Sequence, residues 1–244
     1  MRRILGPARV LVAVLLVLAA ALPAAGWEVR PDAPEEAFEA FHGRFATAAY
    51  HYPRHGASPL GLVGFDVYVD LAADQDFDDE PFYDQAVAGD LPADVLAVSR
   101  VGARKGLPGG IDLGASYAWV LDSDMKLLSA DLQWAILDGG LLSPALSLRL
   151  TGTRSLDDGV YQLEQYGAEL LLSKGFTVLT PYVGAGMAYS EGTLERLDGT
   201  ELSTDDTQAV FYGGVTLNLL LPKITVEVEK GEAVQAAVKV AFGF

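Results

Sequence analysis

The sequence predicts an all-β protein: a transmembrane, antiparallel, up-and-down β-barrel of about ten strands with a short N-terminal amphipathic helix. Three observations predict this class. From Leu62 to Phe244 the chain divides into segments of about ten residues in which every second residue is apolar. Residues 1–26 have the pattern of an export signal. The last segment ends on an aromatic residue, as outer-membrane barrels do.

The N-terminus has the three parts of a secretory signal peptide. Arg2, Arg3 and Arg9 precede an uncharged apolar run over 10–22, and small residues follow before Trp27. The run is shorter than the roughly 20 residues that a membrane-spanning helix needs. We therefore expect cleavage before Trp27 and export of the remaining chain.

The composition excludes several classes of protein. Cleavage would remove three of the 17 basic residues and no acidic ones, which leaves 14 against 33 and a formal charge of −19. A nucleic acid is therefore not expected as a partner. The chain has no cysteine, so disulfides, thiolate metal sites and a lipoprotein anchor are excluded. No cofactor is expected.

Ten alternating segments make up the predicted barrel, residues 61–244. They centre on 63–71, 95–104, 111–121, 128–136, 146–150, 168–172, 183–189, 211–219, 224–228 and 234–244. Their charged residues all alternate with the apolar positions and so share the opposite, polar face of each strand: Asp66, Asp70, Arg100, Arg104, Asp112, Asp131, Arg149, Glu169, Glu227, Glu229 and Lys239. A charge that faces lipid at mid-membrane costs about 2–4 kcal/mol. The apolar faces are therefore expected to contact lipid and the charges to line a polar lumen.

Aromatic residues on the apolar parity distinguish this barrel from a soluble one, whose apolar face would point inward. They are expected to form two membrane interfaces, with Trp119, Tyr189 and Phe211 at one and Trp134, Phe242 and Phe244 at the other. The last strand, with Val240, Phe242 and Phe244, is the predicted signal for the barrel-assembly machinery. Outer-membrane lipid and lipopolysaccharide are the other expected partners.

Connection lengths predict the orientation of the barrel. Short turns at 105–110, 138–143, 174–179 and 221–223 would lie in the periplasm, because outer-membrane barrels have short turns there. The connections at 72–94, 122–126, 154–160, 191–208 and 230–232 would lie outside. Two of these are short, so eight or twelve strands are alternatives to ten.

Residues 27–60 differ in kind from the barrel. Phe38, Phe41 and Phe45 recur at helical spacing after two acidic residues suited to a first turn. This pattern predicts a short amphipathic helix on the periplasmic side, under the barrel or inside its mouth. A packing element that covers this end is the favoured interpretation. A mobile gate is the alternative.

The lumen charges are predicted to pair across strands. If the hairpins pair about their short turns, opposite charges come level: Asp66 with Arg100, Arg104 with Asp112, Asp131 with Arg149, and Lys239 with Asp66. Barrels of this size have interiors almost filled by side chains. The favoured interpretation is therefore a paired polar core. An ion or solute path is the alternative.

The first outer connection contains alternating oxygen ligands, Asp74, Asp76 and Asp78, which suit Ca²⁺. The EF-hand pattern fails, because Asp79 and Gln85 stand where that loop needs Gly and Glu. No metal site is therefore predicted. These acidic loops are expected to lie among lipopolysaccharide headgroups, with divalent cations as bridging partners.

The positions of the three histidines indicate that this protein is not an enzyme. His42, His51 and His55 all precede the first predicted strand. Outer-membrane hydrolases need a histidine base near their nucleophile or acidic partner. With no histidine in a strand or an outer loop, those mechanisms are not expected.

Several stretches resemble a family of proteobacterial outer-membrane β-barrel proteins to which no biochemical activity is assigned. They are Pro59–Gly61 with Gly64–Asp66, Lys105–Pro108 with Gly110–Asp112 and Gly114–Tyr117, Lys126–Leu128, Ser173–Phe176, and Leu179–Tyr182 with Gly184 and Gly186. Gly109 stands where the family has a bulky aromatic residue. The resemblance implies a small barrel in the outer membrane and supplies no catalytic residue.

Together these patterns predict a non-enzymatic outer-membrane barrel that contributes to the cell envelope and presents acidic loops outward. A narrow cation-favouring pore, or a transporter for small solutes or amphiphiles, is the alternative.

Overall fold

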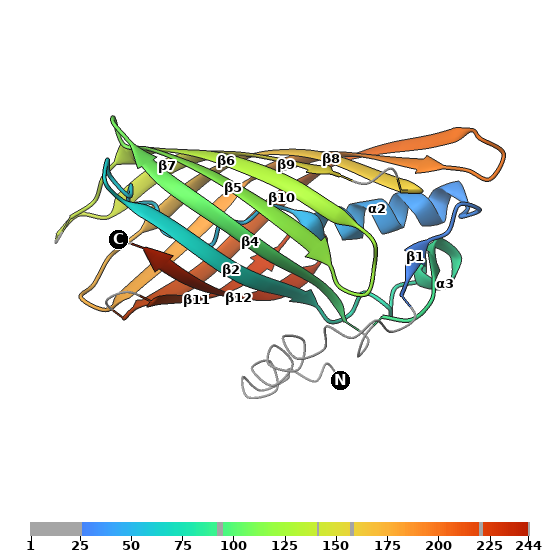
Figure 1. Ribbon diagram of the computed structural model, residues 1–244, viewed down its shortest axis with the longest axis horizontal. Coiled ribbons are helices and arrows are strands. Elements are labelled where there is room, and N and C mark those ends of the chain that lie inside the picture. The colour runs from blue at the N-terminus through green and yellow to red at the C-terminus, as the bar shows by residue number, and fades with distance from the viewer. Residues whose placement is uncertain (1–25, 92–94, 141, 157–158, 220–221, 244) are drawn as a thin grey trace.

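A computed structural model shows ten antiparallel strands closed into a barrel, with one helix inside its mouth (Figure 1). The structure describes residues 26–91, 95–140, 142–156, 159–219 and 222–243. The predicted fold class and the count of ten strands are confirmed. The predicted signal peptide, apart from Gly26, and Phe244 lie outside the described residues.

The barrel strands follow one another around the wall, and the last strand closes against the first. They are β2 (Phe65–Asp74), β4 (Leu96–Leu107), β5 (Ile111–Val120), β6 (Lys126–Leu137), β7 (Ala145–Ser155), β8 (Tyr161–Ser173), β9 (Leu179–Glu195), β10 (Glu201–Asn218), β11 (Pro222–Lys230) and β12 (Val234–Gly243). Gly109 has a φ of 82° in the turn from β4 to β5. This left-handed conformation favours glycine there.

The apolar side chains point outward and the charged ones inward. Val69 on β2 is 51% exposed and Leu170 on β8 is 53% exposed, while Asp70 and Glu169 next to them are 4% and 1% exposed. A soluble barrel would show the reverse, because its apolar face packs at the centre. The alternation of the strands therefore gives the wall an apolar outer surface and a polar interior.

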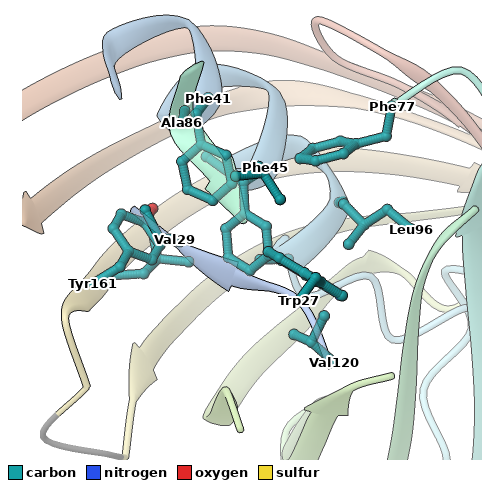
Figure 2. Packing of buried hydrophobic residues seen from close by; sticks show 14 of the residues in the cluster. Trp27, Val29, Phe41, Phe45, Phe77, Ala86, Leu96, Val120 and Tyr161 are labelled. Carbon is teal, nitrogen blue, oxygen red and sulfur yellow. The ribbon is translucent and has the colours of Figure 1, made fainter. Parts of the chain in front are cut away.

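The helix α2 (Glu35–Ala49) lies at the end of the barrel with the long connections, opposite the short turns. Its Phe41 and Phe45 pack against Phe77 from the β2–β4 connection and Tyr161 at the start of β8 (Figure 2). The prediction that the helix lies at the short-turn end is wrong. Its apolar stripe requires an apolar partner, and that partner is at the other end. No helix among the described residues is long and apolar enough to cross a membrane.

Two short elements complete this aromatic cluster. The connection from β2 to β4 contains α3 (Tyr83–Ala86) and β3 (Val87–Ala88), and β3 pairs with β1 (Glu28–Val29). Trp27 precedes β1, is 2% exposed, and donates its Nε1–H to the carbonyl of Leu121 at 3.1 Å. The start of the described chain is thus fixed at the long-connection end.

The hairpin of β9 and β10 continues past the barrel, as Figure 1 shows in orange. The prediction that 191–208 form a connection is wrong, because pairing continues to Glu195 opposite Glu201. Leu194 is fully buried against the aromatic cluster and Leu202 packs on it. The apolar side chains of this hairpin face the aromatic cluster inside the mouth and not the membrane, so the search for outward apolar runs did not identify it as paired strand.

Candidate functional site

The lumen is filled by the segment that follows α2, residues 50–60. Tyr50, Tyr52 and Arg54 are at most 1% exposed. Farther along, the N–H of Ala57 donates to Ser173 Oγ at 2.9 Å, at the short-turn end of β8. The segment therefore runs through the barrel from one end to the other. We call α2 and residues 50–60 together the N-terminal plug.

Arg54 is the ionic centre of the plug. Its Nη1 lies 2.7 Å from Asp70 Oδ1 and its Nε lies 2.8 Å from Glu229 Oε1, with Glu227 Oε1 at 3.8 Å. All four side chains are fully buried. The backbone of Arg54 has a φ of 51°, which is strained for a residue other than glycine. The three carboxylates hold the guanidinium in place despite this strain.

Arg100 on β4 fixes the C-terminal end of α2. Its Nη2 donates to the carbonyls of Ala48, Ala49 and Tyr50 at 3.4, 3.1 and 2.9 Å. The last carbonyls of a helix lack partners within the helix and carry a partial negative charge. The buried guanidinium of Arg100 donates hydrogen bonds to these carbonyls and offsets their partial negative charge. Arg100 therefore joins the barrel wall to the C-terminal end of α2.

Replacement of Arg100 with alanine should lower the stability of the folded barrel by about 1.5–3 kcal/mol, the range for hydrogen bonds to charged groups. The measurement is the temperature at which the compact band of the folded protein disappears on gels. Arg154→Ala is the matched control, because Arg154 lies exposed on β7. Equal heat resistance of both variants and the parent protein would contradict the capping role.

His51 of the plug lies between two residues of the wall. Its Nε2 is 3.0 Å from Asp131 Oδ1 and its Nδ1 is 3.3 Å from Ser116 Oγ. This order of serine, histidine and aspartate is that of serine hydrolases. No strand or outer connection contains a histidine, as predicted, but the plug brings His51 into the lumen.

The environment of this triad favours a structural role. His51 is fully buried and Ser116 is 4% exposed, so a substrate has no approach to the hydroxyl. Asp131 also holds Arg104, whose Nη1 lies 2.7 Å from its Oδ2. We interpret the three residues as a contact that fixes the plug against β5 and β6.

A second polar group lies around Glu169 on β8. It accepts hydrogen bonds from the hydroxyls of Tyr50, at 2.5 Å, and Tyr212, and it lies 3.4 Å from Arg149 Nη1. Gly184 makes room for the Tyr212 ring, because a Cβ there would overlap it. The Glu169 carboxylate thus has partners on both the wall and the plug, as a buried charge requires.

The structure places all eleven predicted lumen charges in the interior, each at most 4% exposed. The predicted pairs are wrong. Asp66 is opposite Arg104, Asp70 is opposite Arg100 and Lys239, Arg104 is opposite Gly114, and Arg149 is opposite Gln133 and Glu169. The observed register differs from the predicted one by an even number of residues in every pair, because only an even shift keeps a side chain on the same face of the sheet. The alternation therefore predicts which face each charge is on but not which residue lies opposite it.

Lys239 on β12 also binds the plug. Its Nζ donates to the carbonyl of Pro53 at 2.6 Å and lies 4.1 Å from the centre of the Tyr68 ring. Asp66 has its own cation, since Lys223 Nζ lies 2.7 Å from its Oδ1. At the short-turn end, Asp112 accepts from the N–H of Leu60 at 3.0 Å.

Sequence reasoning missed the plug residues Tyr50, His51 and Arg54, and it missed Tyr182 and Tyr212 on the wall. Tyr182 donates its hydroxyl to Glu227 in the same way that Tyr212 donates to Glu169. The available signal was the run of aromatic and basic residues at 50–55, which has neither helical nor strand periodicity. Such a run is expected in a segment whose side chains form hydrogen bonds and ion pairs with buried charges at irregular positions on the barrel wall.

The acidic connection after β2 is held by the plug. Arg44 of α2 donates to both oxygens of Asp74, at 2.8 and 2.9 Å, and to Glu80 at 2.8 Å. Within the described ranges, no group of three or more histidine and acidic residues is placed to hold a metal ion.

The predicted assembly signal lies on the outer surface as far as it is described. Phe242 is 54% exposed and points away from the lumen, and Val240 is partly exposed on the same parity. Trp119, Tyr189 and Phe211 are likewise exposed toward the long-connection end, and Trp134 toward the short-turn end.

Comparisons with solved structures find other barrels. The N-terminal barrel domain of OprF from Pseudomonas aeruginosa is 14% identical, with a TM-score of 0.36, covering 73% of this chain and 97% of that one. The KdgM porin is 11% identical, with a TM-score of 0.40, and the match covers 73% of this chain and 99% of that one. An outer-membrane channel from Pseudomonas putida F1 is 11% identical, with a TM-score of 0.48, and the match covers 77% of this chain and 98% of that one. No residue role is transferred at these identities. No protein-family model and no curated protein matches the chain.

Proposed function

We propose that this protein is a non-enzymatic outer-membrane barrel that is closed by its own N-terminal plug, contributes to the envelope, and presents an acidic surface at the long-connection end. The apolar outer wall supports the membrane location. In water, exposed side chains such as Val69, Leu170 and Val228 would form a large apolar surface, which soluble monomers rarely carry. Lipid removes this cost.

The closure is supported mainly by the course of residues 50–60 through the lumen, where residues 50–54 are buried. Arg54, His51 and Tyr50 contact carboxylates on different parts of the wall. Displacing the segment would break these contacts together and leave buried charges without partners. The resting barrel is therefore expected to pass no ions.

One observation favours a second function, a cation-favouring pore that opens when the plug withdraws. Of the eleven lumen charges on the wall, seven are carboxylates and four are cations. The plug adds a fifth cation to the lumen, Arg54. A wall without the plug would carry a net negative charge and would attract cations.

Conductance in planar bilayers tests the proposed closure. The purified full chain, folded and inserted, is expected to give no channel steps at moderate voltage and physiological salt. Regular steps with cation selectivity would refute the closed barrel and establish the pore. Fractionation tests the location: the protein should sediment with outer membranes, and recovery as a freely dissolved monomer would contradict it.

A further inference from the structure

The strand β10 extends farther than its neighbour on one side. It pairs with β9 from Glu201 to Leu217, but its pairing with β11 begins only at Phe211. Among the described residues, Glu201–Val210 therefore have a strand partner on the β9 side alone. Figure 1 shows this hairpin projecting beyond the barrel rim.

The projecting hairpin is held in place rather than loose. Leu202 packs on the aromatic cluster, and Gln208 Oε1 accepts from Thr47 Oγ1 of α2 at 2.6 Å and from the N–H of Glu232 at 3.1 Å. Gln208 is 7% exposed, yet its Nε2 has no hydrogen-bond partner. The open edge is therefore a preformed row of backbone donors and acceptors.

The edge is protected against strand addition by negative charge alone. Natural edge strands are blocked by proline, by charged side chains or by bulges. Residues 201–207 contain no proline, and their pairing with β9 has no register shift, but Glu201, Asp205 and Asp206 are acidic. These carboxylates oppose another acidic strand and leave the edge open to a basic one. An extended segment could align along this edge without rearrangement of the hairpin.

The charges on the hairpin favour a positively charged segment. Glu201 stands opposite Glu195, and Asp205 stands opposite Glu191, all on the exposed face. Like charges directly opposite one another are destabilising. In the part of the chain that the structure describes, no ion pair neutralises these four carboxylates. On the inner side of the edge, burial and the neighbouring Asp206 raise the pKa of Glu232, while Arg44 opposes this shift.

We propose that the β10 edge at Glu201–Thr207 is a docking site for an extended, lysine- or arginine-rich segment of a partner protein, which adds to the hairpin as a third strand. Backbone hydrogen bonds supply the alignment, and the basic side chains lie over the acidic pairs. A second copy of this chain is a poorer partner, because self-pairing would bring two acidic strands together. This site is independent of whether the lumen conducts.

A synthetic peptide tests the proposal with the full chain folded in detergent. The probe is a fluorescent decapeptide of alternating lysine and threonine. Its control has the same sequence with alternate amide nitrogens methylated, which keeps the charge and removes the hydrogen-bond donors. The unmethylated peptide should bind roughly tenfold or more tightly than its control, and added salt should weaken it. Equal affinity of the two peptides, or no binding, would overturn strand addition.

Paired variants locate the site. Glu191→Gln with Asp205→Asn removes one acidic pair and should weaken the probe severalfold. The matched control, Asp79→Asn with Asp84→Asn, removes the same charge from exposed positions in the β2–β4 connection. It should leave binding nearly unchanged. An equal loss in both would refute the β10 edge as the site. The compact gel band confirms that each variant is folded.

Discussion

Deletion of residues 27–60 should turn a silent barrel into one that conducts cations. The deletion removes α2 and every plug contact with the lumen, including those of Arg54 and His51. Water then enters and solvates the wall charges, of which the majority are carboxylates. The tyrosines of the wall remain, so the expected steps are small. Planar-bilayer recording of the full and deleted proteins, each carrying the compact gel band, gives the comparison.

A folded deletion variant that stays silent would show that side chains of the wall close the lumen without the plug. If the deletion does not fold, Arg54→Ala in the full chain is the second test. It removes the central anchor while the barrel strands are unchanged, and brief openings are expected. Absence of openings in both variants would contradict the plug as the barrier.

Replacement of Arg54 with methionine should cost about 3–5 kcal/mol of folding stability, the range for breaking a buried ion pair on one side. The change leaves Asp70 and Glu229 in the interior without the cation that both contact. Unfolding by urea in detergent or lipid gives the free energy. Arg154→Met on the exposed surface is the control, and its stability should be close to that of the parent protein.

Arg54→Lys distinguishes the charge from its geometry. Lysine keeps the positive charge but cannot reach two carboxylates with a planar fork, so an intermediate stability is expected. If the methionine variant were as stable as the parent protein, Arg54 would not be the ionic centre of the plug.

The fold was predictable because side-chain alternation in a strand has a period of two. That period alone placed Asp66, Arg100, Glu169 and the other lumen charges on the inside. Their partners were not predictable, since a shift of two or four residues preserves the alternation. For β2 and β4 the long connection between them gives no turn geometry to set the register.

The N-terminal plug was predictable only in part. Phe38, Phe41 and Phe45 identified α2, because helical spacing places them on one face. Their spacing does not say which end of a barrel supplies the apolar partner. Residues 50–60 have no period at all, so their course through the lumen, with His51 beside Asp131, depends on tertiary contacts that only the structure shows.

A cysteine cross-link between plug and wall tests the central claim most directly. The chain has no cysteine of its own, and a Cβ at Gly56 would lie 3.0 Å from the Cβ of Ser173, close to the separation that a disulfide needs. In the folded membrane protein, Gly56→Cys with Ser173→Cys should form a disulfide under mild oxidation, detected by mass spectrometry. Gly56→Cys with Ser203→Cys, on the distant hairpin, should not. If the first pair stays unlinked and both thiols react with a water-soluble reagent, residues 50–60 do not fill the lumen.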